Sequence, residues 1–251
     1  MNTKKQNYSF ISIAFILLVF GIIFIPRIID RIKVGDVSRT ESRSKGVSVN
    51  GQEAQSDLLF LEINGEAKKV PSFSFKNQNG VVISNQDYEG KVYLVEFFFT
   101  TCGSICPMMN RNLIQIQNTF SDVENFGIAS FTINPEYDTQ EVLKSYADNY
   151  KVTNPNWHFM TGNQDTIYEL ANTGFNIYAG ESPDSDDGFE HSGNFALVDK
   201  NGYMRSRADN FGNPKIFYKG IISEDEKSND EGEIEEISML KQDIAKLLKE
   251  N

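Results

Sequence analysis

The segment VYLVEFFFTTCGSICP, residues 92–107, decides the fold of this 251-residue chain. Its first half is apolar almost throughout and rich in β-forming residues, which is typical of a central strand covered on both faces. From Pro107 to Phe120, apolar side chains recur near helical spacing. These apolar positions are Met108, Leu113, Ile116 and Phe120. The segment therefore predicts a buried strand that leads into a helix through two cysteines.

Cys102 and Cys106 are the two cysteines of the chain. If a helix begins here, their spacing places both side chains on one face, with Cβ atoms about 5–6 Å apart. The two sulfurs can therefore bond to each other or hold one soft metal ion. A thiolate at a helix N-terminus is stabilised by the helix dipole and by unpaired N–H groups, which lowers its pKa. We expect this segment to be a chemical site.

Strands and helices alternate on both sides of this segment. The turn at residues 77–80 and the tripeptide Lys200-Asn201-Gly202 each predict a hairpin. The predicted strands are 58–63, 73–75, 81–83, 126–133, 157–160, 193–198 and 203–205, and the predicted helices are 139–150, capped by Asp138 or Thr139, 166–173 and 233–249. This order predicts a one-domain α/β sandwich. A strand, a loop with two cysteines and a helix form the thioredoxin layout, although the usual spacing has two intervening residues, not three.

The N-terminal region differs from the rest of the chain. Tyr8 to Ile25 is an uncharged run long enough to span a bilayer, and no small-residue cleavage site follows it. We therefore expect residues 1–34 to be an uncleaved membrane anchor with its flanks. Residues 35–57 are polar and read as a flexible linker, which leaves 58–251 as the folded domain. Basic residues flank the apolar run on both sides, so charge alone does not set its orientation.

The charge distribution argues against a nucleic-acid partner. The chain has 24 basic and 35 acidic residues and a formal net charge of −11. The N-terminal region is basic, so the folded part is more acidic than the whole chain. Nucleic-acid binding requires a basic surface that displaces counterions from phosphates. We expect no nucleic acid among the partners.

Two histidines are available as a third ligand to a metal held by the cysteines. His158 lies at the start of a predicted strand, where partial burial explains it equally well, so we leave it out of the ligand set. His191 lies in a loop that leads into a strand expected beside the cysteine strand, and α/β folds place their sites at such loops. Two thiolates and an imidazole suit Cu(I) and Cu(II), and zinc could use the same set with a water. Copper binding requires the thiols to be reduced.

These residues together resemble the Sco/SenC family of membrane-anchored copper-binding proteins. The family has a Cys-x-x-x-Cys-Pro motif after an aromatic strand and a distant His-Ser, which correspond here to residues 102–107 and to His191-Ser192. The segment Asn134-Pro135-Glu136-Tyr137-Asp138 resembles the family's Asp-Pro-Glu-Arg-Asp motif. The chain departs from the family at Gly103-Ser104, where Pro-Asp is common, and at Asn134, which replaces an acidic residue. The loss of an aspartate near the cysteines bears on metal affinity and on the choice of partner.

The resemblance implies a thioredoxin-like α/β sandwich with N-terminal hairpin additions, preceded by a single transmembrane helix. It further implies an exported domain that binds copper through Cys102, Cys106 and His191. Such a domain delivers copper to the binuclear copper site of cytochrome c oxidase, or reduces the cysteines of that site beforehand. The expected partners are the copper-site subunit of the oxidase, other copper chaperones or thiol reductants, and the membrane through Tyr8–Ile25.

Two alternatives remain open at this point. In a thiol-disulfide oxidoreductase, Cys102 would attack a partner disulfide and Cys106 would resolve the mixed disulfide, so that His191 would not be a ligand. In a purely structural role, the two cysteines would form a disulfide around three residues. So short a loop removes little entropy from the unfolded chain, so the stabilisation would fall at the low end of the usual range of about 2–4 kcal/mol.

Overall fold

The computed structural model describes residues 18, 20, 57–182 and 188–250. In the N-terminal unit, residues 1–49, the described residues are Leu18 and Phe20, which are helical and exposed. The predicted membrane anchor Tyr8–Ile25 otherwise lies outside the described residues, as does almost all of the predicted linker. Within the described part of the chain, no helix has both the length and the apolar character needed to cross a membrane. The predicted domain boundaries stay predictions.

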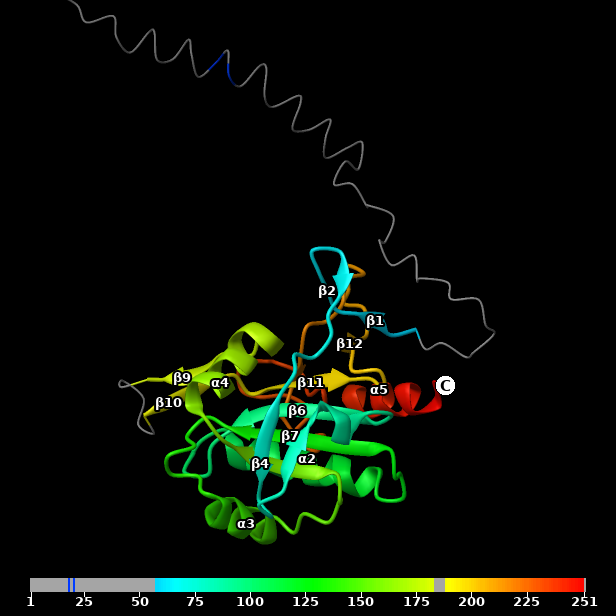
Figure 1. Cartoon of the computed structure of the whole chain (residues 1–251). Coiled ribbons are helices and arrows are strands. Elements are labelled where there is room, and N and C mark those ends of the chain that lie inside the picture. Colours follow the sequence, from blue (N-terminus) through cyan, green and yellow to red (C-terminus); the bar gives the residue numbers. More distant parts are fainter. Residues whose placement is uncertain (1–17, 19, 21–56, 183–187, 251) are drawn as a thin grey trace, which may run out of the picture. The chain divides into compact units, whose positions relative to one another are not determined.

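A seven-stranded mixed sheet forms the centre of the second unit (Figure 1). Its strand order is β13 (Tyr218–Lys219), β11 (Asn194–Val198), β6 (Val92–Phe98), β7 (Phe126–Thr132), β8 (Trp157–Thr161), β4 (Ser74–Asn77) and β5 (Val82–Ser84). Strands β6, β7 and β8 are parallel, and the other pairs are antiparallel. Every residue of β6 and β7 is buried, which confirms the prediction of a central strand covered on both faces.

Aromatic side chains cover both faces of the sheet. On one face, Phe98 of β6 and Phe159 of β8 pack around Tyr146 of α3 (Gln140–Asn149). Helix α2 (Cys106–Thr119) lies on the same face, because its Asn110 side chain donates to the Tyr146 hydroxyl, and α5 (Ile237–Lys249) packs against α2 and β6. On the other face, Phe97 stacks on Phe131. The cysteine strand is thus held rigidly from both sides.

The opposite face also carries the short helices of the fold. They are η1 (Asn85–Tyr88), α4 (Gln164–Glu169) and η2 (Leu170–Phe175). Phe175 of η2 packs edge-on against Phe97. The predicted helix 166–173 is therefore found with an earlier start, where the Asn163 side chain caps α4, and with a π-helical continuation.

Helix α2 confirms the predicted passage from strand through cysteines to helix, but one residue of its predicted buried face differs. Met109 is fully buried, and Met108 is half-buried. The predicted stripe placed Met108 toward the core, and that assignment was wrong by one position. Leu113, Ile116 and Phe120 are buried as predicted. Met109 lies four residues before Leu113 and therefore on the same face, whereas Met108 lies five residues before it. Helix α3 begins after Thr139, whose side chain accepts the Val142 N–H; Thr139 is therefore the cap, and Asp138 is not.

The hairpin predictions are confirmed in part. Strands β4 and β5 pair across the turn that contains Gly80, whose φ of +76° suits glycine. The predicted strand 58–63 divides into β1 (Leu59–Phe60) and β2 (Glu62–Ile63), and β2 pairs with β3 (Glu66–Ala67). These are the expected N-terminal hairpin additions.

The C-terminal hairpin differs from its prediction. The turn at Lys200-Asn201-Gly202 forms, and Val198 bridges to Met204. The next strand, β12 (Arg205–Ser206), pairs with β1 and not with β11. Arg205 explains the difference, because its buried guanidinium binds the Asp199 carboxylate and the Leu58 carbonyl. A buried charge needs such partners. The Leu58 carbonyl directly precedes β1, so this bond holds β12 beside β1.

The last helix starts four residues later than predicted. Glu233 and Glu236 pair with Lys219 and Lys215, respectively, and Glu236 also accepts the Lys219 backbone N–H. These contacts hold the acidic segment against β13 in a non-helical conformation, so helical spacing alone placed the start too early.

Candidate metal centre

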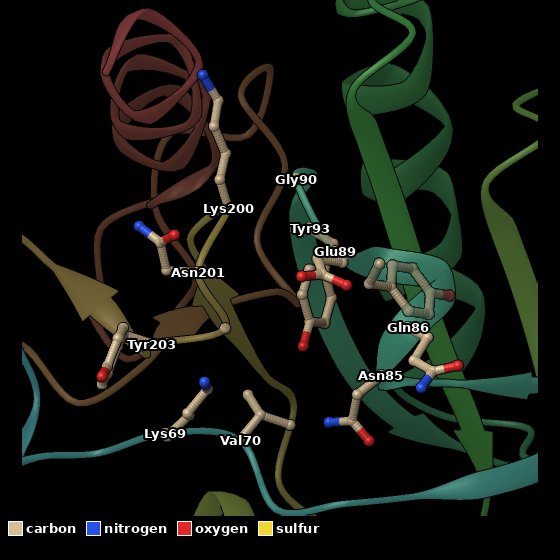
Figure 2. Close-up of a pocket in the computed structure, with 12 residues that line it drawn as sticks. Lys69, Val70, Asn85, Gln86, Glu89, Gly90, Tyr93, Lys200, Asn201 and Tyr203 are labelled. Atoms are coloured by element: carbon tan, nitrogen blue, oxygen red, sulfur yellow. The ribbon is translucent and has the colours of Figure 1, made fainter. Parts of the chain in front are cut away.

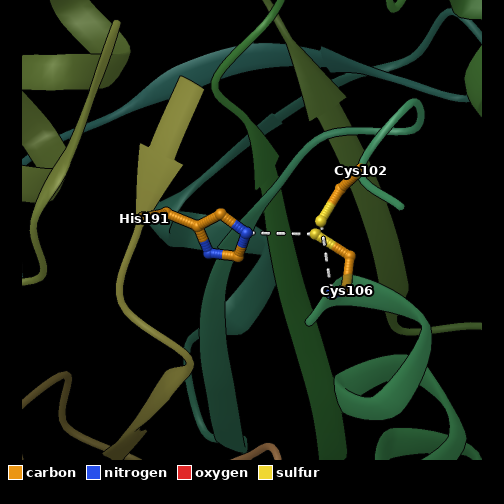
Figure 3. Close-up of side chains that lie close together, drawn as sticks. All are labelled: Cys102, Cys106 and His191. Carbon is orange, nitrogen blue, oxygen red and sulfur yellow. Dashed lines mark hydrogen bonds between the residues drawn. The ribbon is translucent and has the colours of Figure 1, made fainter. Parts of the chain in front are cut away.

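Cys102, Cys106 and His191 come together at the end of β6 (Figure 3). Cys102 lies in the loop after β6, Cys106 is the first residue of α2, and His191 ends β10 (Phe189–His191). All three residues are buried, and one candidate ligand atom from each lies within 4.8 Å of the other two. The three residues predicted as a metal site therefore converge, although 85 positions separate Cys106 from His191.

The distances between the three side chains are short. The Cys106 Sγ lies 3.1 Å from the His191 Nε2, and the Cys106 backbone N–H donates to the Cys102 Sγ over 3.4 Å. Both cysteines are free. The Ser104 hydroxyl lies 3.7 Å from the Cys102 Sγ. At this departure from the family pattern, a neutral hydroxyl therefore faces the sulfur.

The two thiols differ strongly in acidity. The Cys106 thiol, together with the His191 side chain and the backbone N–H groups of Cys106 and Ser104, lowers the pKa of Cys102 to about 3, while burial opposes the shift. The pKa of Cys106 is raised because its thiol donates to Cys102 and is itself buried. At neutral pH, the pair therefore holds one negative charge, on Cys102, and one proton, on Cys106. Cys102 lies outside α2, and the Cys106 thiol contributes most to its lowered pKa; the first helical N–H, that of Cys106, adds to it as expected near a helix N-terminus.

His191 reaches the cysteines through a short antiparallel pair, β9 (Ala179–Glu181) with β10, in which His191 lies opposite Ala179. The prediction of a loop position for His191 was therefore wrong, since the residue ends a strand. Ser192 and Gly193 then lead into β11, which pairs with β6 as predicted. The His191 ring packs edge-on against Phe99, with ring centroids 5.8 Å apart.

Gly193 allows the chain to turn closely between His191 and β11. A Cβ atom at this position would lie 2.3 Å from the Ile221 Cγ2, closer than any packing permits. The Gly193 carbonyl also accepts the Gly220 N–H over 2.7 Å. The approach of two backbone segments therefore fixes where His191 enters the site.

Glu96 is a buried carboxyl group in β6, close enough to the site for its charge to act on Cys106. It was not among the residues predicted for the site. It lies in the middle of β6 with no exposed surface and accepts a 2.6 Å hydrogen bond from the Ser130 hydroxyl, which in turn accepts from the Trp157 indole. Burial raises the pKa of Glu96 to about 7, and a charge on Glu96 raises the pKa of Cys106 further. The sequence signal that could have identified Glu96 is its position as the single charged residue within an apolar, aromatic strand.

The other candidate residues lie elsewhere. His158 is in β8, where its Nδ1 lies 3.2 Å from the Asn77 amide nitrogen and its ring packs edge-on against Tyr88. Met109 packs in the core. Glu190, directly before His191, is exposed, and residues 183–187 lie outside the described residues.

A surface groove lies at the opposite end of β6, where Tyr93 contributes to its wall (Figure 2). Its lining includes Lys69, Asn85, Lys200 and Tyr203. In the described part of the chain, no cysteine or histidine lines it. The thiol chemistry therefore belongs to the other end of the strand.

The arrangement supports two kinds of chemistry. Two sulfurs and an imidazole nitrogen form a soft ligand set that suits Cu(I) and, with the nitrogen, Cu(II). A low-pKa thiolate beside a second thiol is also competent for thiol-disulfide exchange.

Comparison with known proteins identifies the family of the chain. The sequence profile of the SCO1/SenC family matches residues 62–224. The SCO1 protein homolog of Bacillus subtilis (strain 168) is 35% identical over 159 residues, which cover 62% of this chain and 80% of that protein.

Two solved structures share the fold. BsSco, described as a member of the Sco family of cytochrome c oxidase assembly proteins with a disulfide switch, is 27% identical with a TM-score of 0.57, covering 72% of this chain and 94% of its own. A SCO1/SenC family lipoprotein from Bacillus anthracis str. Ames has a TM-score of 0.58 at 23% identity, covering 72% and 95%. This chain belongs to the SCO1/SenC family.

Proposed function

We propose that this protein is a copper metallochaperone, which binds copper through Cys102, Cys106 and His191. The main support for this proposal is that the three ligand atoms lie within 4.8 Å of one another. The charge state of the pair supports this role, because a buried thiolate on Cys102 attracts a cation. Cu(I) would be held by the two sulfurs, and the His191 Nε2 would add a nitrogen for Cu(II).

The proposed recipient is the binuclear copper site of cytochrome c oxidase, to which the protein would deliver copper or whose cysteines it would prepare. Membership of the SCO1/SenC family supports this choice, as does the description of BsSco as a member of a family of oxidase assembly proteins. Other copper chaperones or thiol reductants would supply the metal or keep Cys102 and Cys106 reduced. Nothing in the acidic body of the chain suits nucleic acid.

An anaerobic copper titration of the reduced protein tests this function. We expect one equivalent to bind to the wild type and a loss of at least about 100-fold in affinity in Cys102→Ser/Cys106→Ser, because both soft ligands are removed. His191→Ala should alter the Cu(II) absorption and electron paramagnetic resonance spectra, whereas the matched variant His158→Ala should not. Equal affinity of the wild type and the double variant would overturn the proposal.

Thiol-disulfide exchange is the second candidate function, and the lowered pKa of Cys102 favours it. In this role, the Cys102 thiolate attacks a sulfur of a partner disulfide and displaces the other partner thiolate. The Cys106 thiol then loses its proton and attacks the Cys102 sulfur, which releases the reduced partner and leaves a Cys102–Cys106 disulfide. A Cys106→Ser variant should trap the mixed disulfide in cells, and Cys102→Ser should not. Absence of trapped partners in both variants would remove this role.

We further propose that Tyr8–Ile25 anchors the protein in a membrane as a single span, with the folded domain on the exported side. The uncharged length of this run supports the anchor, and the family supports the side. Alkaline carbonate extraction should leave the full chain in the membrane fraction and release a chain that lacks residues 1–34. Protease added to intact cells or spheroplasts should reach the domain. Release of the full chain by carbonate would contradict the anchor.

A further inference from the structure

We propose that Asp138 is a positioning residue for the metal and redox site, acting through Thr100 on the loop that carries Cys102. The inference rests on the proposed function of Cys102 and Cys106. Asp138 lies just before α3 and is completely buried. Neither its side chain nor its backbone is among the three candidate ligands.

The Asp138 carboxylate joins two chain segments at the end of the sheet. It accepts the Thr100 backbone N–H over 3.1 Å, and the Thr100 hydroxyl also donates to it. The Thr132 hydroxyl, at the end of β7, donates to the same carboxylate. Thr100 follows β6 and precedes Cys102 by two residues, so the carboxylate ties the start of the cysteine loop to the neighbouring strand.

Helix formation does not explain this carboxylate. Thr139 already caps α3, so Asp138 is not required for the helix start. A buried carboxylate is costly unless several donors satisfy it, and here two hydroxyls and a backbone N–H do so. The Asp138 backbone N–H is also used, since it donates to the Asn134 carbonyl over 2.9 Å. The Asp138 backbone therefore bonds within its own segment, and its carboxylate bonds to Thr100 and Thr132.

The cysteine loop needs such a tie because its sulfur contacts are sensitive to small displacements. Beyond Thr100, the Cys102 N–H donates to the Phe99 carbonyl over 3.3 Å, and Gly103 and Ser104 are exposed. The Cys102 Sγ must still meet the Cys106 N–H at 3.4 Å. A site of this kind depends on supporting contacts that hold its side chains within about 0.5 Å. Asp138 supplies that support at the first residue after Phe99.

Two matched variants separate positioning from general stability. Thr100→Val and Thr132→Val each remove one hydroxyl that donates to the same carboxylate, but only Thr100 belongs to the cysteine loop. The Thr132 hydroxyl also accepts the Asn134 N–H over 3.1 Å, so we expect Thr132→Val to lower the melting temperature at least as much as Thr100→Val. The redox equilibrium of metal-free protein with dithiothreitol should shift toward the disulfide by about fivefold in Thr100→Val, because a thiolate that is less well placed is less stabilised. It should stay unchanged in Thr132→Val.

Conservative variants complete the test. Thr100→Ser retains the hydroxyl and should restore the wild-type redox equilibrium, while Asp138→Asn should reproduce the shift of Thr100→Val. Equal shifts in Thr100→Val and Thr132→Val, or no shift in either, would overturn the positioning role. Because the measurement uses no copper, its outcome is independent of the titration that tests the metallochaperone. A protein that binds no copper but shows this pattern would retain Asp138 as a positioning residue for a thiol-disulfide site.

Discussion

Two buried polar clusters of this protein differ in how their charges are balanced. Arg205 is buried against Asp199 and Glu250, with nitrogen–oxygen distances of 2.9 and 3.0 Å, and its guanidinium also stacks on Phe60. In the cluster of Cys102, Cys106 and His191, the negative charge on Cys102 is stabilised by hydrogen bonds from the Cys106 thiol, the His191 side chain and backbone N–H groups. In the first cluster, carboxylates of the chain pair with the buried cation. No lysine or arginine of the described residues is among the groups that lower the pKa of Cys102, so the second cluster suits a cation from outside.

A structural cluster and a binding site differ in how their buried charges are paired. Arg205 and Asp199 are buried, as are Cys102, Cys106 and His191, so burial alone does not distinguish the two clusters. In a structural cluster, a buried charge is paired with an opposite charge of the same chain, because an unpaired buried charge costs several kcal/mol. A site leaves a charge for its ligand to neutralise.

Removing the charge at the structural cluster should have the largest effect on stability. Arg205→Ala leaves Asp199 buried without its partner, so we expect the free energy of unfolding to fall by about 3–5 kcal/mol. Lys144→Ala breaks an exposed pair with Asp148 and should cost about 0.5 kcal/mol or less. Urea unfolding at neutral pH compares the two. A similar loss in both variants would show that burial does not set the value of these pairs.

The buried carboxyl group under the site should make stability depend on pH. The folded pKa of Glu96 is raised to about 7, so its contribution is fully favourable below the unfolded pKa and is lost as pH rises through 7. Glu96→Gln should therefore stabilise the protein more at pH 8 than at pH 5, with a difference of up to about 3 kcal/mol. Urea unfolding at both pH values measures it, with exposed Glu89→Gln as control. The same change at pH 5 and pH 8 would contradict the raised pKa.

Supplying the missing cation should stabilise the site cluster. Cu(I) at about 100 times its dissociation constant should raise the free energy of unfolding by about 2.7 kcal/mol, because it binds the folded state. The gain should vanish in Cys102→Ser/Cys106→Ser and remain in His158→Ala. Thermal unfolding under anaerobic conditions measures it. An equal gain in the double variant would place the copper elsewhere.

Crowding the turn behind His191 should have the smallest effect of the four. A methyl group at Gly193 meets Ile221, so Gly193→Ala should destabilise the protein by about 1–2 kcal/mol and alter the Cu(II) spectrum by moving His191. The second substitution Ile221→Ala makes room for the methyl group and should restore the spectrum. A spectrum unchanged in Gly193→Ala would show that this turn does not position the imidazole.

Much of the fold follows from local sequence patterns. The apolar run of β6, the helical spacing of α2 and the glycine turns are local signals, and the structure confirms the elements they predict. The pairing of β12 with β1 was not predictable in this way, because it depends on Arg205 reaching Asp199 and the Leu58 carbonyl across the chain. The late start of α5 has a similar cause in the ion pairs of Glu233 and Glu236.

The site shows the same division. Cysteine spacing and the position of His191 before a late strand were enough to predict which three residues meet. Asp138 was considered as a helix cap and as part of the segment 134–138 that resembles a family motif. Its bonds to Thr100 and Thr132 were not predicted, since they depend on how β6 and β7 end side by side. Glu96 was read as one residue of an apolar strand. Its pairing with Ser130 requires the parallel register of β6 with β7, which the sequence does not display.

X-ray absorption spectroscopy of the copper-loaded protein tests the central claim most directly, because it identifies the atoms bound to the metal. The account predicts two sulfur ligands in both oxidation states and an imidazole nitrogen in the Cu(II) form, with the nitrogen signal lost in His191→Ala. A copper shell of oxygen and nitrogen without sulfur, or an imidazole signal that persists in His191→Ala, would contradict it.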